Sequence, residues 1–189
     1  MEKRHIISLG GLPGSGKSTV KKILAEKLQM ESFSTGDFMR QMAKERGISF
    51  DDFNALIATD QSIDGEIDAQ LVGIEAMGNY LVVDSHLAFH FVPSSFKVFL
   101  SVPLEISAER IYKDGDKETR QSVGDVMASI DEAKVRIQAR IDNHNDRYMR
   151  FYGVQPYDPS QYDLVIDTAT STPSEVADQV IDAYTKWLG

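Results

Sequence analysis

The stretch Gly11-Leu-Pro-Gly-Ser-Gly-Lys-Ser18 decides the fold, because its eight residues match every position of a Walker A phosphate-binding loop. Its glycines allow backbone angles that turn successive N–H groups inward around an anion. In such a loop, Lys17 reaches the β- and γ-phosphates of a nucleotide, and the Ser18 hydroxyl can ligate Mg²⁺. The residues expected to contact the donor nucleotide are Gly11, Pro13, Gly14, Ser15, Gly16, Lys17, Ser18 and Thr19.

The flanking residues supply the context that this motif needs, which is a strand before the loop and a helix after it. The apolar run 5–9 predicts the strand, and residues 18–28 carry apolar side chains at helical spacing. The N-terminus of that helix would add its dipole to the phosphate site. A glycine-rich turn that binds nothing is the alternative, and a complete match in this context argues against it.

The chain has 189 residues, no cysteine and a formal net charge of −9. This length suits one α/β domain, and no apolar stretch reaches the ~20 residues that span a bilayer. The lack of cysteine excludes thiolate metal sites and disulfides and is compatible with the cytoplasm. The acidic balance argues against a general nucleic-acid binder, which requires clustered cations. We expect no membrane or nucleic-acid partner, and a monomer or weak dimer.

Strand-like apolar runs alternate with helical patterns along the chain. This alternation predicts a doubly wound, three-layer α/β/α fold around a five-stranded parallel sheet, with ligands at the carboxyl ends of the strands. The predicted strands are 5–9, 31–34, 80–84, 96–101 and 163–167. The predicted helices are 18–28, 38–46, two within 49–77 broken near 60–62, 104–111, about 122–152, and one that begins after Thr172.

A second polar motif, Ser34-Thr-Gly-Asp37 followed by Arg40, falls at the carboxyl end of the second predicted strand. Asp37 and Arg40 share one face of the next helix. Arg40 could hold a phosphate through a bidentate fork. Alternatively, Asp37 caps its helix and Arg40 is solvated, and the motif alone leaves both open.

Asp84 ends the third predicted strand, which is the position of a Walker B acid that orients Mg²⁺. Such an acid can also cap a turn, but the Walker A partner favours the metal role. The four histidines do not form a metal set, although His86 and His90 are four apart. Asp64 and Asp68 fit the solvated face of an amphipathic helix.

Arg136, Arg140 and Arg147 fall at i, i+4 and i+11 of the long predicted helix, so their side chains should point in a similar direction. Convergent arginines stabilise the charge on a transferring phosphoryl group. The alternative is a solvated face paired with neighbouring acids. The same two interpretations, a phosphate contact or a solvated cation, apply to Arg110, which lies just before the charged loop 113–117.

The Walker A loop, the Ser-Thr-Gly-Asp-x-x-Arg element and the arginine-bearing helix together resemble the nucleoside monophosphate kinases. A resemblance over nearly the whole chain is to the short, archaeal-type cytidylate kinases. It is carried by four segments, namely 10–17, the Met-Ala-Lys-Glu-Arg-Gly stretch 42–47, the aromatic-rich helix end 147–153, and the late strand 162–168.

This resemblance implies that the γ-phosphoryl group of ATP passes, with Mg²⁺, to a nucleoside monophosphate such as CMP or dCMP. It implies a core of 1–37, 78–109 and 153–189, an acceptor-binding insertion at about 38–77 and a lid at about 110–152. Lys17, Arg140 and Arg147 would be catalytic, Ser18 and Asp84 would hold Mg²⁺, and Arg110 would join the donor site. The acceptor-binding residues would be Ser34, Gly36, Asp37, Arg40, Asp84 and His86.

Two positions depart from the family pattern, because His86 and Gly65 stand where acceptor-facing arginines are usual. His86 would replace an arginine as a cation only below its pKa, near 6.5 unless perturbed. The loss of two cations would weaken monophosphate binding, shift the preferred base, or leave an ATP-binding protein that acts on a different acceptor. Two alternatives therefore stay open: a P-loop kinase for another acceptor, adenylate kinase-like or acting on a small metabolite, and a nucleotide-binding regulatory protein with a degenerate acceptor site.

Overall fold

The computed structural model describes residues 4–57, 61–77, 80–114 and 127–189. Its centre is a five-stranded, wholly parallel sheet with the strand order β2-β3-β1-β4-β5, which confirms the predicted sheet. The strands are β1 (Ile6–Gly11), β2 (Glu31–Ser34), β3 (Leu81–Asp84), β4 (Phe96–Ser101) and β5 (Leu164–Asp167).

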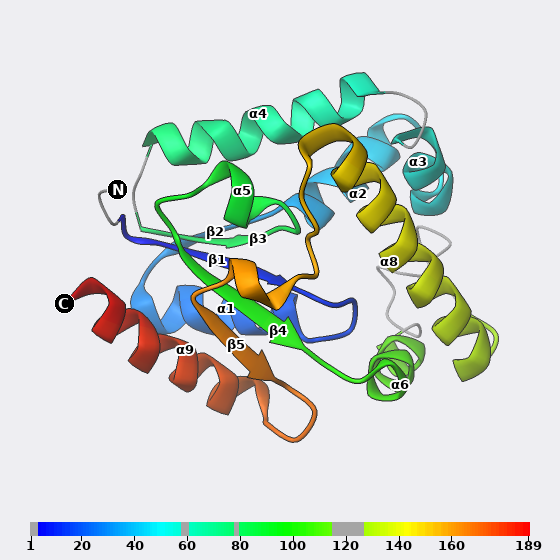
Figure 1. Ribbon diagram of the computed structural model, residues 1–189. Helices are drawn as coiled ribbons and strands as arrows, with labels where there is room; N and C mark the ends of the chain where they lie inside the picture. The colour runs from blue at the N-terminus through cyan, green and yellow to red at the C-terminus, as the bar shows by residue number, and fades with distance from the viewer. Residues whose placement is uncertain (1–3, 58–60, 78–79, 115–126) are drawn as a thin grey trace.

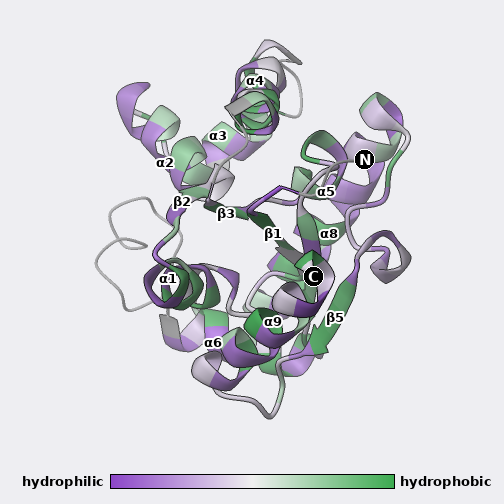
Figure 2. Cartoon of the chain, turned by 90° about the vertical axis from the view of Figure 1, so that its left-hand side faces the viewer, coloured by the Kyte–Doolittle hydropathy of each residue, from purple (hydrophilic) through white to green (hydrophobic). Residues whose placement is uncertain are grey.

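Helices cover both faces of the sheet, as the alternation of strands and helices predicts (Figure 1). On one face, α1 (Lys17–Leu28) and α9 (Pro173–Leu188) pack against Ile7 and Leu9. On the other face, α4 (Gln61–Met77), α5 (Ala88–Phe91) and the end of α8 (Ile130–Tyr152) pack around Ile6. Alternate side chains of β1 therefore enter opposite cores, and Figure 2 shows β1 and β3 as a hydrophobic centre between the helical layers.

The strand register collects the polar motifs at one edge of the sheet. Ser34 lies beside Asp84 across β2 and β3, and Leu9 lies beside Asp84 across β1 and β3. The chain leaves β1 for β2 and β3 on one side and returns to β4 on the other. This reversal opens the crevice in which open α/β sheets bind their ligands.

Two small helical groups flank that crevice. The helices α2 (Thr35–Glu45) and α3 (Phe50–Ile57) share a core with the start of α4. The helix α6 (Leu104–Asp114) shares another with α8 through apolar residues such as Ile111 and Ile137. These groups occupy the ranges predicted for the insertion and the lid, and the division of the chain into those units stays a prediction.

Side-chain caps explain where several helices begin. The side chain of Ser34 accepts a hydrogen bond from the Asp37 N–H, so α2 begins at Thr35 and not at residue 38 as predicted. Thr172 and Glu175 form a complete capping box at the start of α9. The short helix α5 and the 3-10 helix η1 (Pro159–Gln161) were not predicted. Within the described ranges, no helix is both long and apolar enough to cross a membrane.

Parts of three predictions lie outside the described residues. These are the turn at 78–79, residue 60 of the helix break predicted near 60–62, and residues 115–126, which include most of the charged loop and the first residues of the long predicted helix. The described part of that helix begins at Ile130, after Ser129 caps it by accepting from the Glu132 N–H.

Gly10 and Gly73 provide a matched test of backbone packing. A Cβ at Gly10 would lie 2.6 Å from a ring carbon of Tyr162, whereas a Cβ at Gly73 in α4 would meet no atom within 4 Å. We expect Gly10→Ala to lower the free energy of unfolding by about 1–3 kcal/mol because of overpacking. Gly73→Ala should raise it by about 0.5–1 kcal/mol, because alanine loses less backbone entropy in a helix. Urea titrations of both variants check the opposite signs, and equal midpoints would contradict them.

Candidate active site

The phosphate-binding loop is fixed by its neighbours on β4 and α6. The Leu12 N–H donates to the Leu100 carbonyl at 3.2 Å, and the Ser107 hydroxyl donates to the Pro13 carbonyl at 2.6 Å. Gly14 and Gly16 have φ values of +70° and +86°, which side chains rarely tolerate. Residues 14–19, which comprise the end of the loop and the start of α1, line one cavity, as an anion site at a helix N-terminus requires.

Lys17 lies at the centre of this space. Its Nζ donates to the carbonyl oxygens of Gly11 at 2.9 Å and Leu12 at 2.8 Å. Burial lowers the pKa of its ammonium group, Asp84 opposes that shift, and Arg140 adds to it. The ammonium is thus a desolvated charge held by weak acceptors, which a phosphate oxygen can replace.

Asp84 and Ser18 form a pair that suits a divalent cation. The Ser18 hydroxyl donates to Asp84 Oδ2 at 3.2 Å, and the Thr35 hydroxyl donates to the Asp84 backbone carbonyl at 3.4 Å. Burial raises the pKa of the Asp84 carboxyl, while Lys17 and Lys21 act in the opposite direction. Mg²⁺ prefers oxygen ligands, so this hydroxyl and this carboxylate fit the predicted ion.

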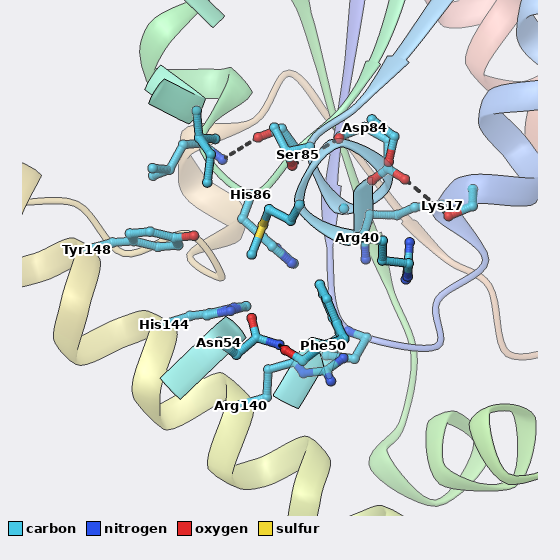
Figure 3. A pocket seen from close by; sticks show the side chains of 18 of the residues that line it. Lys17, Arg40, Phe50, Asn54, Asp84, Ser85, His86, Arg140, His144 and Tyr148 are labelled. Atoms are coloured by element: carbon cyan, nitrogen blue, oxygen red, sulfur yellow. Dashed lines mark hydrogen bonds between the residues drawn. The ribbon is translucent and has the colours of Figure 1, made fainter. Parts of the chain in front are cut away.

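Two cavities meet at the phosphate-binding loop. One, of about 170 Å³, extends from the loop between α2, α3, α4 and α8 (Figure 3). The other, of about 590 Å³, extends over the start of α1 toward α6 and α9. Residues that line both are Gly14, Lys17, Ser18, Arg40 and Ile111. The ammonium group of Lys17 is therefore accessible from both cavities, as phosphoryl transfer between two substrates requires.

Arg40 stands at the junction of the cavities and is positioned by Asp37. Its Nη1 donates to Asp37 Oδ1 at 3.0 Å, and its guanidinium lies 5.2 Å from the centre of the Phe50 ring. Lys21 contacts the other Asp37 oxygen at 3.2 Å. Ser34, and not Asp37, caps the helix, so the Asp37 carboxylate is available for its ion pairs with Arg40 and Lys21.

Arg110 reaches the second cavity from α6. It donates to the Thr168 carbonyl at 2.7 Å and to the Thr168 hydroxyl at 3.1 Å, and it lies 3.5 Å from the Gly14 carbonyl. The guanidinium joins the phosphate-binding loop to the segment after β5. Its planar face lines the cavity into which we predict the donor nucleotide binds.

The three arginines of α8 do not converge, which corrects the sequence prediction. Arg140 lines the smaller cavity (Figure 3). Arg136 pairs with Glu132 at 2.6 Å on the partly exposed side of the helix. Arg147 is buried, where it donates to the Tyr148 hydroxyl at 2.7 Å and lies 4.0 Å from Asp64. Helical spacing predicts the direction of a long side chain only approximately, and here Glu132 and Tyr148 hold two of the three guanidinium groups at different places.

His86 and His144 both line the smaller cavity, where their rings are in contact, and Figure 3 shows both rings near Arg140. Their ring centres are 4.8 Å apart, and His144 Nδ1 lies 2.7 Å from the Tyr157 hydroxyl. Burial, together with nearby cations such as Lys17, holds the pKa of both imidazoles well below 6.5. His86 is therefore neutral near pH 7 and does not replace a fixed arginine cation.

Sequence reasoning missed several residues of the smaller cavity and misplaced two. Asp64 and Asp68 line the cavity from α4 and are not on a solvated face. Their spacing with Ile67 and Leu71 at i, i+3, i+4 and i+7 was a signal of one common face. Gly65, in contrast, is exposed. The other cavity residues not predicted are Thr35, Met39, Phe50, Asn54, Ser85, Leu87, Ile111, His144 and Tyr148.

Comparison with known proteins connects this geometry to a family. A family model described as "AAA domain" matches residues 7–137. The cytidylate kinase of Sulfolobus acidocaldarius is 33% identical over 95% of this chain and 94% of its own length. That of Methanosarcina acetivorans is 35% identical over 86% of each chain. The chain belongs to the cytidylate kinase family.

Other relatives of this cytidylate kinase family member differ in length or share only the fold. A nucleotide dehydratase from Lacinutrix mariniflava, described as S-adenosylmethionine-dependent, is 35% identical over 95% of this chain, which covers 36% of that protein. Shikimate kinase from Bacteroides thetaiotaomicron superposes with a TM-score of 0.63 at 15% identity, covering 96% of this chain and 98% of its own. An uncharacterized protein from Eubacterium ventriosum superposes with 0.65 at 18% identity, covering 97% of each chain. These structures show the P-loop kinase fold.

The neutral state of His144 predicts a pH dependence of stability. The unfolded chain takes up a proton at this residue near pH 6.5, whereas the folded chain does so only at much lower pH. The contribution of His144 is therefore complete above pH 6.5 and is lost as the pH falls through the window below it. Between about pH 8 and pH 5.5, the difference in unfolding free energy between wild type and His144→Gln should shift by about 1.4 kcal/mol against the wild type.

Urea titrations of the two proteins at both pH values measure this shift. Groups common to both proteins, including the buried carboxylates, largely cancel in the difference. A difference that does not change with pH would show that His144 takes up its proton in the folded protein as readily as in the unfolded chain.

Proposed function

We propose that this protein transfers the γ-phosphoryl group of ATP to a nucleoside monophosphate, with CMP or dCMP as the acceptor and Mg²⁺ as the required ion. The observation that carries the proposal is the meeting of two cavities at Lys17, Ser18 and Arg40. A nucleotidase or a simple ATP sensor needs one nucleotide cavity, whereas a kinase needs a donor site and an acceptor site that share a phosphate centre. The names of the relatives support cytidine as the acceptor nucleoside.

In this proposal the larger cavity takes the donor. The backbone of residues 11–16, Lys17, Ser18, Thr19 and Arg110 would bind ATP. Ser18 and Asp84 would hold Mg²⁺, which when bound supplies charge neutralisation between the β- and γ-phosphates. The smaller cavity takes the acceptor, whose phosphate would lie between Arg40 and Lys17, close to Arg140. Ser34, Gly36 and His86 complete the proposed acceptor site, and Asp37, which lines the larger cavity, would serve it by holding Arg40.

The chemistry requires positioning and charge rather than a covalent nucleophile. An oxygen of the acceptor phosphate attacks the γ-phosphorus in line, a new P–O bond forms, and the bond to the bridging oxygen of ADP breaks. Lys17 stays paired with the moving group, because it reaches both cavities. Arg140 stabilises charge on the equatorial oxygens. The catalytic role of Arg147 stays a prediction, since its guanidinium contacts the Tyr148 hydroxyl and lines neither of the two cavities.

We further propose that the protein acts in the cytoplasm on free nucleotides, as a monomer or weak dimer. The acidic net charge of −9 supports small Mg²⁺-bound nucleotides over nucleic acids as ligands.

A coupled assay of ADP release across the common monophosphates tests the proposed function. We expect CMP and dCMP to accelerate ADP release strongly over ATP alone. Lys17→Ala should abolish the acceleration, because the shared phosphate centre loses its cation. Equal release with and without every monophosphate would overturn the assignment, and acceleration by another acceptor only would redirect it.

Substitution of Arg40 tests whether this residue binds the monophosphate rather than ATP. Arg40→Ala should raise KM for the monophosphate by about 10–100-fold, the cost of losing one charge-assisted phosphate contact. KM for ATP should change little, because the loop backbone and Arg110 hold the donor. Arg150→Ala, an exposed arginine of α8, is the matched control and should leave both constants unchanged. A parallel rise in KM for ATP would contradict the placement of Arg40.

A further inference from the structure

Asp64 carries a buried carboxylate oxygen that the described part of the protein leaves without a partner. The residue lies in the first turn of α4, is only 4% exposed and lines the smaller cavity. Its Oδ1 lies 4.0 Å from Arg147 Nη2, a long distance for an ion pair. Its Oδ2 is buried and accepts no hydrogen bond from any described residue.

A second carboxylate on the α4 side of the smaller cavity does have a hydrogen-bond partner. Asp68, one turn later on α4, accepts a hydrogen bond from the Tyr152 hydroxyl at 2.6 Å. An unpaired buried carboxylate oxygen costs several kcal/mol of desolvation. Burial raises the pKa of Asp64, and Arg147 only partly opposes that shift. A group that donates a hydrogen bond from inside the cavity would remove this cost.

The position of Asp64 indicates which part of an acceptor it would meet. The cations Lys17, Arg40 and Arg140 mark the phosphate end of the cavity, and a carboxylate repels a phosphate. On the same face of α4, Ile67 and Leu71 line the cavity with apolar surface. Such surface suits the flat face of a base better than the hydroxyl groups of a ribose. Asp64 therefore lies where it would meet the edge of the acceptor base, away from the phosphate end of the cavity.

Resting on the proposed function, we propose that Asp64 selects the acceptor base by accepting a hydrogen bond from an exocyclic amino group, so that cytosine is favoured over uracil. Cytosine carries an amino donor at the position where uracil carries a carbonyl acceptor. A carboxylate pairs with the first and repels the second. A buried polar group of this kind discriminates strongly, because the wrong base leaves it unpaired.

The test compares kcat/KM for CMP and UMP in the full-length wild type and in Asp64→Asn. The wild type should prefer CMP by at least about tenfold. The side chain of asparagine has the same shape and can turn an N–H donor toward the uracil carbonyl, so the preference should fall by about tenfold or more. Glu66→Gln, an exposed residue of the same helix that pairs with Arg46, is the matched control and should retain the wild-type ratio.

A second measurement uses the wild type alone and so does not depend on folding of the variant. The monophosphate of the pyrimidin-2-one ribonucleoside lacks the amino group but is otherwise close to CMP in shape. Its kcat/KM should be at least about tenfold below that of CMP. Equal values for the two acceptors would overturn the role of Asp64.

Three further outcomes are distinct. If Asp64→Asn changes the ratio of CMP to dCMP and leaves the ratio of CMP to UMP intact, the carboxylate contacts the ribose and the base assignment is wrong. If the wild type phosphorylates CMP and a folded Asp64→Asn keeps the CMP preference, only the Asp64 inference fails. If the wild type phosphorylates no monophosphate, the proposed function itself fails.

Discussion

The buried ammonium group of Lys17 is the constraint around which the rest of the structure is arranged. A charge in this position must be kept near acceptors, and the loop supplies two carbonyl oxygens while β3 supplies Asp84. β1 fixes the start of the loop, and α6 holds its middle through Ser107 and Pro13. The cations Arg40 and Arg140 approach from α2 and α8, so both cavities converge on one charge that phosphate groups can satisfy.

The fold was largely predictable because its signals are local. The Walker A residues, the apolar run that ends at Asp84 and the capping residues of α9 each require only neighbours in the sequence. The alternation of strands and helices then indicated the parallel sheet, and with it the edge at which Ser34, Asp84 and the loop meet. Lys17, Ser18, Arg40 and Asp84 came together as predicted for this reason.

The smaller cavity was less predictable because it depends on contacts between distant segments. Helical spacing placed Arg147 near Arg140, but in the folded protein Arg147 is buried beside Tyr148 and lines neither of the two cavities. The spacing of Asp64 and Asp68 with Ile67 and Leu71 indicated a buried face of α4, yet the charge of the two aspartates favoured a solvent-exposed face. His144 gained its place only through Tyr157 and His86, which come from other parts of the chain. A sequence pattern gives the face of a helix and does not give what packs against it.

The central claim is that Lys17 connects two substrate cavities in one phosphoryl transfer. The most direct measurement follows the γ-phosphoryl group from ATP labelled at that position in the presence of CMP. We expect the label to appear as the β-phosphate of CDP, and we expect Lys17→Ala to lose this transfer. Label released only as inorganic phosphate, at a rate that CMP does not change, would contradict it.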